Sequence, residues 1–132
     1  MEKLQFTINI EASAAKVWDI MLSDETYRIW TQAFSKGSHF VGDWKQGSKI
    51  QFLGPDAKGK MSGMISRIVE NRANEFISIE HLGFVEDGIE DTSSEAAKSW
   101  AGALENYTFK NLENSTQLIV ETETTAEFKK MF

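Results

Sequence analysis

The chain has 132 residues, of which 41% are hydrophobic and 26% are charged, and this length and composition are typical of a single globular domain. Its formal net charge of −6 argues against nucleic acid and anionic membrane surfaces as partners, because both bind basic faces. The absence of cysteine excludes disulfides and thiolate chemistry, and it fits the cytoplasmic location expected for a chain with no signal peptide and no apolar run of ~18 residues.

The first part of the chain predicts one strand followed by two short helices. Apolar and polar residues alternate over 4–11, and a period of two is typical of a half-buried strand. Ser13 is a suitable N-cap for a helix that carries Val17 and Trp18 on one face. Ser23 begins a second helix, whose first turn is acidic. The apolar surface assigned to that helix consists of Tyr27, Ile29, Trp30 and Phe34.

The segment 40–52 predicts a strand, a tight turn and a second strand. The turn lies between Gly42 and Gly47, and Trp44 lies inside it. A tryptophan in a turn is poorly placed to join a core, because turns lie at the surface. We therefore expect Trp44 at the rim of a cavity or at an interface, where an amphipathic ring is favoured.

Two further strands are predicted at 61–70 and 76–82, and imperfect alternation in the first of them indicates a bulge at Gly63. A long connection spans 83–102. Its acidic part, 86–91, lacks the ligand order of a calcium-binding loop and is interpreted as a solvated loop at the mouth of the cavity.

The last predicted elements are a short helix at 94–100 and two strands at 103–110 and 116–122. Thr124 and Glu127 then have the spacing of a capping box, which predicts the start of a C-terminal helix.

Four segments, taken in order, carry a resemblance to a known family. They are 8–18, 42–52, 63–69 and 100–109, the last leading into 118–120. Their order and spacing resemble the START-like, birch-pollen-allergen-like "helix-grip" superfamily. The likeness is greatest to bacterial proteins similar to the activator of the heat-shock-protein-90 ATPase.

The resemblance implies one START-like domain over 1–132 with an α+β fold. A curved antiparallel sheet of about seven strands, with two short helices after the first strand, would grip a C-terminal helix over an apolar cavity. The family's final helix continues past the position of Phe132, so we expect this helix to be shortened here. The sheet face that it leaves uncovered is a candidate surface for a second subunit, and hence for a homodimer.

Catalytic signals in the sequence are few. There is no metal-ligand spacing, no nucleophile elbow and no phosphate-binding glycine loop, so no cofactor or metal is expected. Strand parity places His81 and Glu105 on the inward face, where they could act as a general acid–base pair. The alternative is a hydrogen-bonded polar pair that closes or tunes a cavity, because buried polar groups normally occur paired.

The leading hypothesis is that the domain binds a small hydrophobic or lipid-like molecule without catalysis. The predicted wall of its cavity consists of Trp30, Phe34, Phe52, Ile77, Ile79 and Tyr107. The predicted polar anchors are His39, His81 and Glu105, and the predicted mouth is formed by Trp44 and Trp100. Two alternatives stay open. One is a protein-interaction module, chaperone-regulating by family analogy or self-associating, and the other is a cavity enzyme that uses His81 and Glu105.

Overall fold

A computed structural model of the chain describes residues 2–33 and 36–124. Phe34 and the predicted C-terminal helix lie outside these residues. Within the described ranges, no helix is both long enough and apolar enough to cross a membrane.

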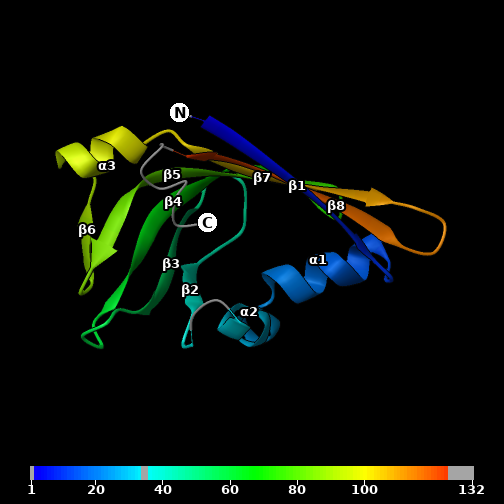
Figure 1. Cartoon of the computed structure of the whole chain (residues 1–132), viewed down its shortest axis with the longest axis horizontal. Helices are drawn as coiled ribbons and strands as arrows, with labels where there is room; N and C mark the ends of the chain where they lie inside the picture. The colour runs from blue at the N-terminus through cyan, green and yellow to red at the C-terminus, as the bar shows by residue number, and fades with distance from the viewer. Residues whose placement is uncertain (1, 34–35, 125–132) are drawn as a thin grey trace.

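The domain is built on one curved antiparallel sheet with short helices (Figure 1), which confirms the predicted α+β class. Seven strands are hydrogen-bonded in the order β1-β8-β7-β5-β4-β3-β2, and an eighth short strand, β6, pairs with β5. The strands are β1 (Glu2–Ile10), β2 (His39–Gly42), β3 (Lys49–Pro55), β4 (Met61–Arg72), β5 (Phe76–Glu86), β6 (Ile89–Asp91), β7 (Leu104–Asn111) and β8 (Thr116–Thr124).

The helices begin where the sequence predicts them. Ser13 caps α1 (Ala14–Leu22), and its Oγ accepts the Lys16 backbone N–H at 3.2 Å. Ser23 precedes α2 (Asp24–Trp30), which continues into the short 3₁₀ helix η1 (Thr31–Ala33). Ser94 caps α3 (Glu95–Trp100) in the same way as Ser13 caps α1, by accepting the Ala97 N–H at 3.1 Å.

The core lies between the inner face of the sheet and α1. Strand register places Ile68 opposite Ile79, and both are almost completely buried. Val17 reaches this layer from α1, which runs beneath the sheet together with α2 in Figure 1. The two helices cover only part of the sheet, and the space between them and the middle strands forms the cavity described below.

Two local predictions were wrong. The predicted bulge at Gly63 is absent, and the register of β4 and β5 shifts instead between Ile65 and Ser66 and between Ile68 and Glu70. Gly63 is needed for a different reason: a Cβ there would lie 1.8 Å from the Phe52 carbonyl oxygen of the neighbouring strand, so only glycine fits.

The acidic segment 86–91 is mostly exposed, as predicted, but it forms a hairpin rather than a loop. Asp87 and Gly88 both have positive φ, which suits a tight two-residue turn, and the chain returns as β6. Glu90 on this strand accepts hydrogen bonds from Gln51 at 2.8 Å and Lys49 at 3.3 Å. Glu90 therefore ties the segment to β3, and no residue of the segment lines the cavity.

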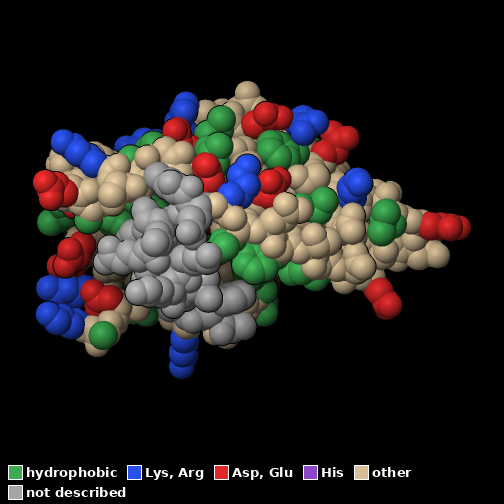
Figure 2. Space-filling view, turned by 45° about the horizontal axis from the view of Figure 1, so that its top comes forward, with side chains coloured by type: hydrophobic (Ala, Val, Ile, Leu, Met, Phe, Trp, Pro, Cys, Tyr) green, Lys and Arg blue, Asp and Glu red, His purple; other side chains and the backbone are tan. Residues whose placement is uncertain are grey.

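On the face shown in Figure 2, basic side chains are dispersed among acidic ones, and no broad basic surface forms there. This distribution agrees with the net charge of −6. A phosphate backbone needs a continuous basic footprint, and this face does not offer one.

Candidate ligand-binding cavity

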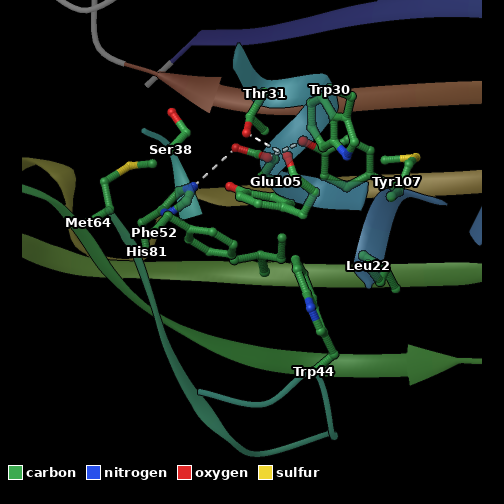
Figure 3. A pocket seen from close by; sticks show the side chains of 13 residues that line it. Leu22, Trp30, Thr31, Ser38, Trp44, Phe52, Met64, His81, Glu105 and Tyr107 are labelled. Atoms are coloured by element: carbon green, nitrogen blue, oxygen red, sulfur yellow. Dashed lines mark hydrogen bonds and ion pairs between the residues drawn. The ribbon is translucent and has the colours of Figure 1, made fainter. Parts of the chain in front are cut away.

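A cavity of about 240 Å³ lies between α1 and α2 on one side and the inner face of the sheet on the other (Figure 3). Apolar and aromatic side chains form most of its wall, and a few polar groups lie at one end. It is lined by Met21, Leu22, Tyr27, Trp30, Thr31, Ser38, Trp44, Phe52, Met64, Ile79, His81, Glu105 and Tyr107.

Aromatic rings in mutual contact form one side of the cavity. Tyr27 packs edge-to-face on Trp30 at a centroid distance of 5.3 Å and on Phe40 at 5.1 Å. Trp44 continues the cluster, 5.3 Å from Phe40 and 5.5 Å from Phe52. Contacts of this kind fix ring orientation as well as burying area. The wall is therefore held in shape by its own packing.

The turn that carries Trp44 is fixed from the neighbouring strand. The Asn71 side chain donates to the Trp44 carbonyl oxygen at 2.8 Å, and the Gln46 side chain accepts the Asn71 backbone N–H at 3.1 Å. These bonds hold the turn over the cavity. They explain how a tryptophan between two glycines comes to line an interior space.

A chain of hydrogen bonds forms the polar end of the cavity. Ser66 Oγ lies 2.8 Å from His81 Nδ1, and His81 Nε2 lies 3.3 Å from Glu105 Oε1. The Tyr107 hydroxyl donates to the other carboxylate oxygen, Oε2. Strand pairing produces this arrangement, since Ser66 is opposite His81 and Glu105 is opposite Ile79, two residues along β5 from His81. In Figure 3 His81 and Tyr107 both point toward Glu105.

The network changes the acidity of its members. Burial opposes ionisation of Glu105, but the hydrogen bond and charge of His81 and the hydrogen bond from Tyr107 outweigh it and lower the pKa of this carboxyl. Burial, and then the charge of Glu105, raises the pKa of Tyr107 well above its usual range. The same two causes, in the same order, raise the pKa of Tyr27 to about 12. At neutral pH the end of the cavity therefore holds one carboxylate and two neutral phenols.

This geometry limits the chemistry available. Ser66, His81 and Glu105 have the order of a nucleophile, a base and an orienting acid, but Ser66 is completely buried and does not line the cavity. A substrate carbonyl would not reach its hydroxyl. In the described part of the chain, no group of three or more metal-ligating side chains lies together. The reachable polar group at this end of the cavity is therefore the Glu105 carboxylate and not the Ser66 hydroxyl.

The structure brings together seven of the residues predicted for the site. These are Trp30, Trp44, Phe52, Ile79, His81, Glu105 and Tyr107. Three other predicted residues lie elsewhere. Ile77 is buried in the core, and His39 makes a 3.0 Å contact between Nδ1 and the Gly37 carbonyl oxygen. Trp100 does not line the cavity but stacks on His81 with centroids 5.1 Å apart, and Phe34 lies outside the described residues.

The sequence predicted only part of the contribution of the helices: Trp30 was assigned to the wall, but Met21, Leu22, Tyr27 and Thr31 were not. Tyr27, Trp30 and Thr31 follow the i, i+3, i+4 pattern of one helix face, and all three line the cavity. That pattern was available in the sequence. Ile29, which was assigned to the same apolar surface, is instead 64% exposed. Ser66 carried no signal, because the bulges that bring it opposite His81 are visible only in the paired strands.

The lowered pKa of Glu105 predicts a specific acid sensitivity. A carboxyl whose folded pKa lies below its unfolded value adds stability above the unfolded pKa, and this stability is lost as the pH falls through the folded pKa. The unfolding free energy of the wild type, minus that of Glu105→Gln, should be largest near neutral pH and shrink below about pH 4.

Comparing the pH dependence of unfolding of the wild type with that of Glu105→Gln isolates the contribution of Glu105. Asp56, Glu90 and Asp91 also have pKa values lowered by local hydrogen bonds, and they act equally in both proteins. A difference that stayed constant from pH 7 to about pH 3 would contradict the assigned ionisation of Glu105.

Comparison with known proteins shows similarity in structure only. No family model and no curated protein matches the chain. Among solved structures it is similar to the Aha1 dimer from Colwellia psychrerythraea, with 18% identity and a TM-score of 0.69 over 99% of this chain and 85% of that one. It is similar to protein NE0264 from Nitrosomonas europaea, with 12% identity and a TM-score of 0.71 over 98% of this chain and 79% of that one.

A third solved structure is much longer than this chain. DynU16, from the dynemicin biosynthetic locus, aligns at 10% identity and a TM-score of 0.67 over 96% of this chain and 38% of that one. At identities this low, the comparisons establish architecture and not activity. They confirm that the chain has the helix-grip fold, the fold that the resemblance of its sequence to START-like proteins implied.

Proposed function

We propose that this domain binds a small, mainly apolar molecule in the cavity beneath its sheet and does so without covalent catalysis. The observation that carries the proposal is the composition of the cavity wall. Aromatic and aliphatic side chains enclose the space, and a single buried polar network lies at one end. Small-molecule sites have this character: an apolar lining with a few placed polar groups that fix the orientation of the ligand.

The polar network supports binding over catalysis. His81 is 2% exposed and uses both ring nitrogens, one toward Ser66 and one toward Glu105. A general base must accept a proton from the substrate, and neither nitrogen of this ring faces the cavity free of a partner. His81 thus acts to orient Glu105, the member of the network that a ligand can reach.

A titration with a neutral aromatic probe tests the proposal. Phenethyl alcohol is added to the protein while the indole N–H resonances of the four tryptophans are followed by NMR. We expect saturable shifts at Trp30 and Trp44, which line the cavity. Resonances that stay unmoved at every concentration would refute the proposal.

Self-association is a second candidate function, supported by a different observation. Phe6 and Ile8 on β1 are each 51% exposed and lie opposite Val120 and Leu118 of β8, on the inner face of the sheet. Exposed apolar residues that adjoin a core are typical of interaction surfaces. One similar structure is itself described as a dimer.

Mass measurement in solution, by light scattering during gel filtration, tests this second function. We expect a dimer that the Phe6→Lys, Ile8→Lys double variant converts to a monomer, because two charges would be buried at the interface. A monomer at all concentrations of the wild type would contradict self-association.

A further inference from the structure

The cavity wall carries a carboxylate but no permanently charged basic side chain among its described lining residues. Glu105 is the one acidic residue among the described lining residues, and none of them is lysine or arginine. The Glu105 side chain is 24% exposed, whereas that of His81 is 3% exposed. Of this pair, a molecule that enters the cavity therefore meets mainly the carboxylate.

This carboxylate has room for another donor. It accepts one hydrogen bond from His81 and one from Tyr107, and a carboxylate offers about four lone-pair sites. Both ring nitrogens of His81 already have partners, Ser66 at Nδ1 and Glu105 at Nε2, so the imidazole does not compete for a donor group of the ligand. The charge of Glu105 also reaches the opposite wall, because it contributes to the raised pKa of Tyr27.

The aromatic wall, like the Glu105 carboxylate, favours a positively charged ligand. Tyr27, Trp30, Trp44, Phe52 and Tyr107 all line the space. Tyr27 and Trp30 meet at 74° and Trp44 and Phe52 at 53°, so the rings are turned in several directions. The face of an aromatic ring carries partial negative charge and attracts cations, most strongly where water is excluded. An anion would instead meet both the carboxylate and these faces unfavourably.

We infer that the ligand is a small organic cation, an ammonium group on an apolar body, with the ammonium directed at Glu105 and enclosed by the aromatic wall. This inference rests on the proposed function and narrows its ligand class. The cavity of about 240 Å³ is below the ~300–1,000 Å³ of typical ligand pockets, so the apolar body is a single ring or a short chain.

Three probes that share one ring and differ in charge test the inference. Phenethylamine, phenethyl alcohol and phenylacetate are titrated at pH 7 and physiological salt, where the amine is protonated and exposed charges are screened. We expect the amine to bind about tenfold more tightly than the alcohol, and phenylacetate to bind least.

Two variants that each remove one negative charge test whether the preference for the amine comes from Glu105. Glu105→Gln should lower the affinity for phenethylamine to that for the alcohol and leave the alcohol within about twofold. Glu80→Gln removes the same charge from a side chain of similar exposure, 26%, that pairs with Arg67, and it should leave the amine preference intact.

The outcomes separate this inference from the proposed function. Equal binding of amine and alcohol in the wild type, or stronger binding of phenylacetate, would overturn the cation assignment and leave cavity binding in place. No binding of any of the three probes would overturn both. The comparison among probes needs only the wild-type protein, so it decides the inference even if Glu105→Gln does not fold.

Discussion

Leu22→Trp is expected to abolish binding of phenethyl alcohol, lowering its affinity by more than about tenfold, because the larger side chain fills space that the ligand needs. Leu22 is the last residue of α1 and lines the cavity near Met21 and Tyr27. The cavity is small, so an added indole ring occupies a large share of it. Titration of the folded variant, followed by tryptophan NMR, measures the effect.

Ile20→Trp is the matched control for this substitution. Ile20 lies on the same helix, is 41% exposed and does not line the cavity. This variant should bind phenethyl alcohol within about twofold of the wild type, since exposed substitutions away from a site have small effects. Equal affinity in the two variants would place the ligand outside the cavity.

His81→Ala should lower the unfolding free energy by about 3 kcal/mol, because it removes one partner of a buried pair and leaves the other unsatisfied. Three contacts are lost together. Ser66 Oγ loses the acceptor or donor at Nδ1, Glu105 loses the hydrogen bond from Nε2, and Trp100 loses the ring stacked on it. Urea denaturation at pH 7 measures the difference.

The other histidine in the chain supplies the control. The His39 ring makes an exposed contact with the Gly37 carbonyl oxygen, and the residue lies on the short strand β2. His39→Ala should change the unfolding free energy by no more than about 0.5 kcal/mol. If His81→Ala proved equally mild, the network would not be the stabilising unit described above.

The fold could be predicted from the sequence because its signals are local and repeated. Alternation predicted β1, serines at the N-cap positions predicted α1, α2 and α3, and a pair of glycines predicted the turn with Trp44. Strand parity also placed His81, Glu105 and Tyr107 on one face, and this is the face that borders the cavity. Each of these inferences needs only the period of an element and the residue that begins or ends it.

The rest of the site depends on contacts between elements. Strand parity puts Ile77 on the inner face of the sheet. There it is completely buried among other core side chains, so it does not line the cavity. Trp100 was expected at the mouth, but α3 carries it against His81. β6 was not predicted because three residues of acidic sequence give no alternation signal, and pairing with β5 alone creates the strand.

Intermolecular NOEs from bound phenethyl alcohol to the protein test most directly whether the cavity is the binding site. We expect NOEs from the ring protons of the ligand to the methyl groups of Ile79 and to the indole of Trp44, both of which line the cavity. NOEs to Phe6 and Ile8 on the exposed part of the sheet, with none to Ile79 or Trp44, would contradict it.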